Sequence, residues 1–518
     1  MKLQRLYLGD YKVLRDLDIR FGLPGKNSIA FTHPPSYSLD FLVGVNGTGK
    51  STVLQVLFDL MRKLERQAPV NYPFEMEYEL GKDDRRTVIF SNLYQDLEAE
   101  EIRFTKTPTV WEVDGNGQRR EVQLSLALLP QMVVAFTSGS EEAWKNFDER
   151  QISAIDNLEA IQTLLPIERA IRELPGKASS FSASEEPPSE EESKFLFIQA
   201  QQLPLVTLSG LLSDLAKPLQ KRRLQRVLKE AKIGTMAGFS LKFRKTQVTA
   251  DRGYWDEVVR LAKLATRRLR LGTDYLLVFD LTDPENPIAQ QIIEEFSTGL
   301  YLFKILTRLA KVSGDGQSVL RDVNIFLERS PNSEHPETEK QDPPLHLLGW
   351  LSDGERSFLG RICLFTLLGS SEALILLDEP EVHFNDFWKR QIVHLLDEIL
   401  EEQHSHVLIS THSSITLTDV PREDIIVLDR NADYTSNAFH PGFRTFAADP
   451  SDIMVHVFGA PYPAGALSVH RIEQEIENSS NRSPSEQRTV LEELLNKVVA
   501  QGYWSYLIRR ELQALQQE

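Results

Sequence analysis

The sequence feature that most constrains the fold is a glycine-rich segment, Gly44 to Thr52, which fits the pattern G-x-x-x-x-G-K-[ST]. It follows the short apolar run Phe41-Leu42-Val43 and precedes a segment whose aliphatic residues recur at helical spacing. A strand, a glycine turn and a helix in this order direct backbone N–H groups and the positive end of the helix at one point. The segment therefore predicts a phosphate-binding loop in an α/β domain rather than an ordinary turn.

The residue types of this loop suit a nucleoside triphosphate with its metal ion. Glycines let the backbone turn inward around a β-phosphate without Cβ clashes. Lys50 would supply charge to the β- and γ-phosphates, and the Ser51 hydroxyl would be a ligand of Mg²⁺. We therefore expect ATP and Mg²⁺ as cofactors, bound by the following loop residues: Gly44, Asn46, Gly47, Gly49, Lys50, Ser51 and Thr52.

A second feature is the apolar strand Ala373–Leu377, which ends in Asp378 and Glu379. A buried strand with this ending places both carboxylates at the carboxyl edge of a parallel sheet, where α/β folds bind ligands. Asp378 is expected to hold Mg²⁺, and Glu379 to orient or deprotonate the attacking water. An apolar strand ending in two acids is common by itself, so the prediction depends on the presence of the phosphate loop in the same sequence.

Two weaker features complete the set. Ser352 and Glu355 have the spacing of a capping box, so a helix should begin there, and Gly354 lies between them in the string LSDGE. Such a helix N-terminus could bind a γ-phosphate through Ser352, Gly354 and Glu355. His412 follows the strand Val407–Thr411, where a neutral imidazole can bond a γ-phosphate or the water beside it. A capped helix and a lone histidine usually have structural roles. Here they occur together with the phosphate loop and the acidic strand, which favours a role in nucleotide binding.

These four elements in this order resemble the ATP-binding-cassette (ABC) type of ATPase, with LSDGE as the signature and His412 as the histidine switch. The gap of 328 residues between Lys50 and Asp378 is too long for a transporter cassette. It is similar to the SMC/RecF/OLD-like branch, in which a long insertion splits the head. Asp353 and Glu355 depart from the usual LSGGQ, as this branch tolerates. The resemblance implies a dimer in which each phosphate loop meets the other subunit's LSDGE around ATP.

The string Leu377–His383 resembles the DEPE-x-H of RecF-like and OLD-family ATPases in bacterial defence. The strings Leu129–Gly139 and Gly502–Arg510 resemble PtuA-type defence ATPases of the Septu or retron-associated kind. The resemblance implies a sensor or switch in bacterial antiviral defence. It implies a separate effector nuclease of HNH type as partner, with retron nucleic acid or a reverse transcriptase as further candidates. The alternative is a RecF- or SMC-like DNA-repair ATPase, although an SMC arm would show sustained heptads, which the insertion lacks.

An OLD-type ATPase-nuclease is a third hypothesis, and the sequence argues against it. Such an enzyme needs a carboxylate metal site after the head. No D-x-D follows His412, and the acids there are scattered: Asp424, Asp429, Asp449 and Asp452. The chain is therefore expected to be an ATPase but no nuclease by itself. Gln131 begins a strand, so it is a poor candidate for a Mg²⁺-sensing glutamine. Asn385-Asp386 suits either the D-loop of the family or a helix cap.

The expected fold class is α/β: an ABC-type head split by a long, mostly helical insertion, with a helical C-terminal tail. The expected domains are 1–140 and 345–430 for the head, 141–344 for the insertion with a mobile acidic loop at 182–193, and 431–518 for a C-terminal extension that is helical at its end. The periodicity further predicts strands at 3–8, 12–21 and 238–248, helices at 205–232 and 254–271, and an exposed Pro-rich loop at 330–344.

Charge and composition limit the partners. The 58 basic and 75 acidic residues give a net charge of −17, which argues against a generic polycation on nucleic acid. Basic clusters in the insertion could still contact phosphates, although solvated helix faces explain them equally well: Lys221–Arg223 with Arg226, Lys242 with Arg244 and Lys245, and Arg267, Arg268 and Arg270. The single cysteine, Cys363, excludes a disulfide framework. Neither a membrane span nor an apolar leader segment is visible, so the cytoplasm is the expected compartment.

Overall fold

The protein was analysed as a computed structural model. The structure describes residues 1–22, 37–81, 85–96, 101–113, 117–145, 194–230, 233–244, 252–272, 274–310, 318–328, 345–367, 372–401, 403–462 and 464–515. The chain divides into two compact units, Met1–Phe446 and Ala447–Glu518. The acidic loop at 182–193, the Pro-rich loop at 330–344 and Lys245 lie outside the described residues.

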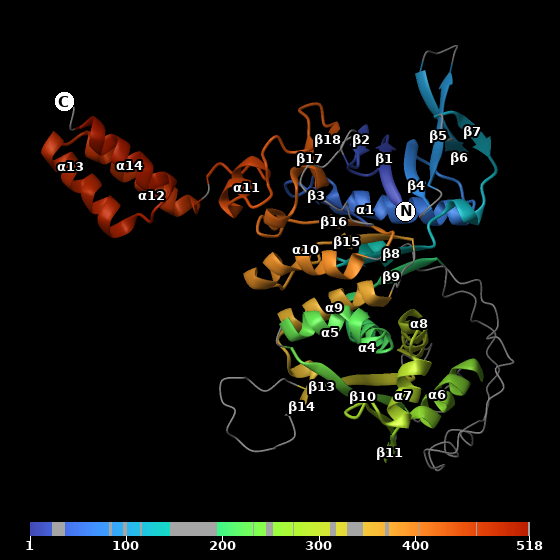
Figure 1. The fold of residues 1–518 in the computed structure, drawn as a ribbon. Helices are drawn as coiled ribbons and strands as arrows, with labels where there is room; N and C mark the ends of the chain where they lie inside the picture. Colours follow the sequence, from blue (N-terminus) through green and yellow to red (C-terminus); the bar gives the residue numbers. More distant parts are fainter. Residues whose placement is uncertain are drawn as a thin grey trace, which may run out of the picture. The chain divides into compact units, whose positions relative to one another are not determined.

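A central sheet in the first unit carries the predicted motifs (Figure 1). Its described strands are, in spatial order, β18 (Ser436–Phe439), β17 (Ile425–Arg430), β3 (Ser38–Val43), β16 (His406–Ser410), β15 (Ala373–Asp378), β8 (Met132–Thr137) and β9 (Phe195–Ile198). All neighbouring pairs are parallel except the β17–β18 pair at one edge. Strands from both sides of the expected insertion lie side by side in this sheet, so the two predicted halves of the head form one structure. Strand β9 at the edge comes from within the range 141–344 that was expected to be insertion.

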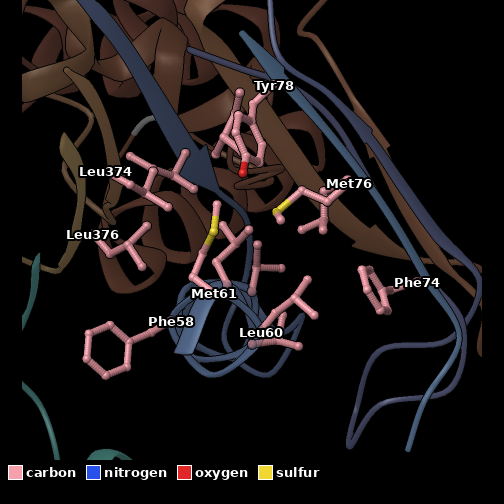
Figure 2. Packing of buried hydrophobic residues seen from close by; sticks show 14 of the residues in the cluster. Phe58, Leu60, Met61, Phe74, Met76, Tyr78, Leu374 and Leu376 are labelled. Carbon is pink, nitrogen blue, oxygen red and sulfur yellow. The ribbon is translucent and has the colours of Figure 1, made fainter. Parts of the chain in front are cut away.

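Helix α1 (Lys50–Glu65) lies between the central sheet and a second, antiparallel sheet. The second sheet has the order β2 (Leu17–Arg20), β1 (Lys2–Leu8), β4 (Phe74–Leu80), β5 (Arg86–Asp96), β6 (Glu101–Val113) and β7 (Arg119–Val122). Figure 2 shows Phe58, Leu60 and Met61 of α1 between Met76 of β4 and Leu374 of β15. This apolar packing fixes the helix whose N-terminus forms the phosphate loop.

The other face of the central sheet carries α9 (Asp353–Leu367) and α10 (Asp386–Leu400), as Figure 1 shows. Helix α4 (Leu203–Leu215) of the insertion packs on α9. The contact is close, because a Cβ added to Gly210 would lie 2.6 Å from the carbonyl oxygen of Cys363. The insertion is therefore packed directly on the helix that begins with the LSDGE string.

A five-stranded antiparallel sheet is formed by four strands of the insertion and by β14, which begins just beyond the expected limit of 344. Its order is β11 (Arg267–Leu271), β12 (Asp274–Asp280), β10 (Thr235–Arg244), β13 (Leu320–Glu328) and β14 (Leu345–Leu347). The remaining α-helices in the described residues of this unit are α2 (Glu142–Lys145), α5 (Arg223–Glu230), α6 (Arg252–Leu264), α7 (Pro287–Glu295) and α8 (Gly299–Ala310). The α/β fold class is confirmed, and the strand predicted at 238–248 corresponds to β10.

Three local predictions need correction. The helix expected over 205–232 is two helices, α4 and α5, because the chain turns at Pro218 between them. The helix expected to reach residue 271 ends at Leu264, and the alternating sequence RRLRL of β11 pairs with β12. The strand expected over 12–21 is reduced to β2, because Lys12 and Asp16 adopt positive φ angles in a turn.

The second unit is helical in its described residues. Its helices are α11 (Pro450–His456), α12 (Ala466–Ser480), α13 (Pro484–Glu493) and α14 (Tyr503–Ala514). Ile472, Leu491 and Ile508 form its small core, which explains why the tail folds as a unit. The first unit includes β18 and ends at Phe446, beyond the head limit of 430 expected from the sequence. Among the described helices, none has the length and apolarity to cross a membrane.

Candidate ATP-binding site

The loop between β3 and α1 has the conformation that a phosphate loop requires. Gly44, Gly47 and Gly49 have φ angles of 147°, 86° and 103°, in the region that favours glycine. Two of them also have close neighbours. A Cβ on Gly44 would lie 2.3 Å from the backbone oxygen of Leu428, and one on Gly49 would lie 2.4 Å from Cδ2 of Leu14. The glycines are therefore required by backbone geometry and by packing.

These neighbours allow a test that separates strain from collision. Gly44→Ala adds a Cβ against rigid backbone, whereas Gly47→Ala meets nothing within 4 Å and adds only conformational strain. We expect Gly47→Ala to cost roughly 1–2 kcal/mol of loop stability. Gly44→Ala should cost clearly more and weaken binding of a fluorescent ATP analogue further than Gly47→Ala does. Equal affinities for the two variants would contradict the close approach of β17 to the loop.

Lys50 is 5% exposed, and its Nζ donates hydrogen bonds to the carbonyl oxygens of Gly44 (2.9 Å) and Val45 (3.2 Å). Burial lowers the pKa of Lys50, and the nearby charges of Glu379 and Asp378 oppose this effect. The ammonium group thus lies inside the curve of the loop, facing the two acids. A cation in this position suits an anion such as a triphosphate.

Asp378 is surrounded by hydroxyl groups. Ser51 (2.8 Å) and Ser410 (2.6 Å) donate to Oδ1, and Thr137 (3.0 Å) donates to Oδ2. The register explains this, because Asp378 ends β15 between its parallel partners Thr137 of β8 and Ser410 of β16. Carboxylate and hydroxyl oxygens are hard ligands of the kind that Mg²⁺ prefers. Ser51 and Asp378, the predicted metal residues, are thus in direct contact and fit Mg²⁺.

Glu379 and His412 form a pair beside Asp378. His412 Nε2 lies 3.1 Å from Glu379 Oε1, and both side chains are about one-third exposed. Glu379 has a positive φ of 49°, and its N–H donates to the carbonyl oxygen of Ser410 (3.1 Å). Burial lowers the pKa of His412, as does the charge of Lys50, while Glu379 opposes both. The imidazole is therefore neutral at neutral pH and can donate its Nε2–H to Glu379.

The LSDGE string forms the predicted helix start. Ser352 Oγ accepts from the N–H of Glu355 (3.2 Å), and the Glu355 carboxylate accepts from the N–H of Ser352 (2.8 Å), as a capping box requires. An open hollow of about 440 Å³ lies beside it. The hollow is lined by Ser352, Gly354, Glu355, His383, Asn385, Phe387 and Trp388. This lining contains no residue of the phosphate loop, so the two predicted nucleotide-binding groups lie in different places on the described chain.

Two uncertain positions have structural roles. Asn385 caps α10 by accepting from the N–H of Trp388 (3.0 Å), while it also lines the hollow. Gln131 contacts Glu372 at the beginning of β15, which is the end of the strand opposite to Asp378. Gln131 therefore has no place beside the metal residues.

Several residues of the site were not predicted from the sequence: Thr137, Ser410, Glu381 and Arg361. Thr137 and Ser410 each end a buried strand, which is a usable signal only when the strand order is known. Glu381 and Arg361 are buried charged residues next to the same sheet edge. Arg361 could have been noticed in the sequence because it is a charged residue within the otherwise apolar second half of α9.

Many cations of the insertion clusters bond within the chain. Arg222 donates to the carbonyl oxygen of Lys217 (2.8 Å), Arg223 pairs with Glu401 (2.9 Å), and Lys242 pairs with Asp274 (3.4 Å). Arg268 donates to the end of α6. Arg267 and Arg270 lie exposed on β11. These contacts favour a structural role for much of the basic sequence.

The loop, the acids and the histidine thus lie at one edge of the central sheet of an α/β fold, in the arrangement expected of a phosphate-binding site. A family model described as "AAA domain, putative AbiEii toxin, Type IV TA system" matches residues 254–419. This match includes LSDGE, Asp378, Glu379 and His412 but not the phosphate loop, and it supports an ATPase related to AAA domains. No curated protein sequence matches the chain.

Solved structures similar to the chain include heads of SMC proteins. An SMC head bound to the C-terminal winged-helix domain of ScpA has 13% identity and a TM-score of 0.32, over 85% of this chain and 98% of that one. The SMC head from Thermotoga maritima has 12% identity and a TM-score of 0.33, over 86% and 100%. An SMC head bound to the C-terminal domain of ScpA from Pyrococcus furiosus has 12% identity and a TM-score of 0.29, over 85% and 96%. Because these TM-scores are low, the assignment of the site rests on its own geometry.

Proposed function

We propose that the chain binds and hydrolyses ATP as the sensor or switch subunit of a bacterial antiviral defence complex, and that it controls a separate nuclease through ATP-dependent head dimerisation. The observation that carries the ATPase part is the cluster at the carboxyl edge of the central sheet. There Lys50 faces Asp378, Asp378 contacts Ser51, and Glu379 contacts His412.

In the proposed reaction Lys50 and the loop N–H groups hold the β- and γ-phosphates. Ser51 and Asp378 would hold Mg²⁺, which would neutralise charge on the phosphate oxygens. Glu379 accepts a proton from water as the water oxygen bonds to the γ-phosphorus, and the bond to the β,γ-bridging oxygen breaks to leave ADP and phosphate. His412 donates to Glu379 and so keeps the base oriented.

The separation of the phosphate loop from the LSDGE hollow supports a dimer. In the proposed sandwich, the hollow of one chain receives the ATP held by the phosphate loop of the other, so two chains complete two sites. ATP binding would close the pair and hydrolysis would open it, because only the ATP state offers a γ-phosphate to Ser352 and Gly354. Since α4 packs on α9, this motion would reach the insertion.

The defence setting rests on the PtuA-like strings, and the description of the matching family, which names a toxin of a type IV toxin–antitoxin system, adds support. The second candidate is a RecF- or SMC-like DNA-repair ATPase, which shares the head. Purification of the native complex distinguishes them. A bound nuclease, with or without retron nucleic acid or a reverse transcriptase, would support defence, and repair proteins as partners would support the alternative.

The isolated chain is expected to hydrolyse ATP but to cut neither DNA nor RNA. Phosphodiester cleavage needs carboxylates or histidines clustered around one or two cations. No group of three or more metal-ligating side chains occurs within the described ranges. Of the acids after His412, Asp449 caps α11 through the N–H of Ser451 (2.8 Å), which is a structural role.

The test measures phosphate release and cleavage of labelled DNA and RNA by the purified chain, with and without the co-purified partner. Cleavage should require the partner. Strong cleavage by the chain alone, abolished by substituting an acid between Asp424 and Asp452, would restore the OLD-type hypothesis.

A further inference from the structure

A buried carboxyl group lies behind the proposed hydrolysis site. Glu381 is 6% exposed and follows Glu379 in the turn after β15. It accepts a hydrogen bond from the Thr411 hydroxyl and one from the N–H of His412 (3.3 Å). Burial raises the pKa of Glu381, and the bond from Thr411 opposes this effect. Burying a carboxyl group costs free energy, and both of these hydrogen bonds join it to the end of the strand that carries His412.

The turn around Glu381 is held by other groups as well. Arg361 of α9 donates to the carbonyl oxygen of Val382 (2.8 Å), and the N–H of Phe384 donates to the carbonyl oxygen of Glu381 (3.0 Å). The N–H of Val382 donates to the backbone carbonyl oxygen of Glu379 (3.2 Å). Because these bonds use main-chain atoms of the turn, the Glu381 side chain can be removed while the turn keeps its anchors.

Arg361 also gives the buried carboxylate an opposite charge. It is 4% exposed, lies between the rings of Phe136 and Phe384, and donates to Ser138 Oγ (2.8 Å). Burial lowers the pKa of Arg361 to about 10, and Glu381 opposes this effect. The guanidinium therefore remains charged at neutral pH.

We propose that Glu381 is a positioning residue for ATP hydrolysis: it fixes the main chain at His412 so that the imidazole stays against the base Glu379. The inference rests on the proposed ATPase function. Within the part of the chain that the structure describes, the Glu381 side chain bonds Thr411 and His412 but not Lys50, Ser51 or Asp378, so its proposed role concerns the chemical step and not nucleotide binding. Arg361 belongs to α9, the helix that begins with LSDGE, and it bonds the turn that contains Glu381. The turn is therefore connected to the signature helix through Arg361 and to His412 through Glu381.

The test compares Glu381→Ala and Glu381→Gln in the full chain by steady-state ATPase assay. Glu381→Ala should lower kcat by about tenfold to a hundredfold, because small misplacements of reacting groups have effects of this size. The KM for ATP should not change. Glu381→Gln keeps a carbonyl oxygen that can accept from His412 N–H and Thr411, so it should recover much of the lost kcat. A merely structural residue would show neither the kcat-only effect nor this rescue.

Glu372→Ala is the matched control, since Glu372 is a partly buried acid at the other end of β15, where it accepts from the N–H of Gly81 (2.9 Å). It should leave kcat unchanged. If thermal melting shows that Glu381→Ala does not fold, Thr411→Val removes one of the two bonds and should still lower kcat with KM unchanged.

The proposal is overturned if folded Glu381→Ala retains full kcat, or if its loss appears as a raised KM. Failure of the proposed function would look different: wild-type chain would release no phosphate above the level of Lys50→Ala.

Discussion

Lys50→Ala is expected to reduce ATP hydrolysis by about 100- to 1000-fold, which is the usual effect of removing one preorganised group that stabilises transition-state charge. The Lys50 ammonium is enclosed by the loop and faces Asp378 and Glu379. The neighbouring cation of Arg430 donates to the carbonyl oxygen of Gly47 from outside the loop (3.0 Å), so it cannot take over this position. ATP affinity should fall too, by roughly 1.5–3 kcal/mol for the lost charge-assisted hydrogen bonds.

The variant should fold normally. Burial disfavours the Lys50 charge, as its lowered pKa indicates, so removing the ammonium should not destabilise the chain without nucleotide. Thermal melting therefore separates the two effects: the melting temperature without ATP should be retained, and the rise on adding Mg·ATP should disappear.

Lys63→Ala provides the control on the same helix. Lys63 lies in the last turn of α1 and pairs with Asp59 (2.7 Å), far along the helix from the loop. Its loss should cost at most about 1 kcal/mol, as is usual for a partly exposed ion pair, and leave turnover unchanged. Normal turnover by Lys50→Ala would refute the assignment of the phosphate loop.

The site elements could be predicted from the sequence because each depends on local order. Gly44–Thr52 follows an apolar strand, Asp378 ends one, and Ser352 and Glu355 are three residues apart. Such patterns fix a side chain at the end of a strand or helix without knowledge of the fold. The same logic predicted β15 and β16 within a residue or two of their bounds.

The hydroxyl shell of Asp378 could not be predicted in this way. Thr137 lies 241 residues before Asp378 along the chain, and only the order β16-β15-β8 brings it and Ser410 to the carboxylate. Strand order is set by packing of α1 between two sheets and of α9 on α4, which are contacts between distant segments. Arg361 and Glu381 are hidden for the same reason, since their partners belong to different elements.

The errors have a different cause. Residues 267–271 contain three arginines among leucines, and the sequence predicts the end of a helix there. Pairing with β12 makes the segment a strand instead. At Lys12 and Asp16, residues that commonly occur in strands or turns adopt positive φ angles, which side-chain periodicity cannot indicate. In both places tertiary contacts override a short local pattern.

Glu379→Gln is expected to bind ATP and to accumulate ATP-bound dimers. The substitution removes the base, so hydrolysis should fall by about 100- to 10,000-fold. The contacts of Asp378 with Ser51 and of Lys50 with the loop do not involve Glu379, so Mg·ATP binding should persist. Glutamine also keeps a carbonyl oxygen that can accept from His412 Nε2, so the geometry of the pair should be retained.

Light scattering with and without Mg·ATP measures this outcome, and the mass of Glu379→Gln should double on adding ATP while wild type returns to its starting mass as ATP is consumed. Two further variants show which groups the ATP-dependent dimer requires.

Adding Lys50→Ala to Glu379→Gln should abolish the ATP-dependent dimer, because the phosphate loop no longer holds the nucleotide. Adding Ser352→Arg should also abolish it while ATP still binds, because the long side chain fills the hollow beside Gly354. A chain that is already oligomeric should instead retain ATP through gel filtration in Glu379→Gln and lose it when Ser352→Arg is added. An unchanged mass together with no retained ATP would contradict the sandwich, since a base-deficient site that holds Mg·ATP between two chains has no route to reopen by hydrolysis.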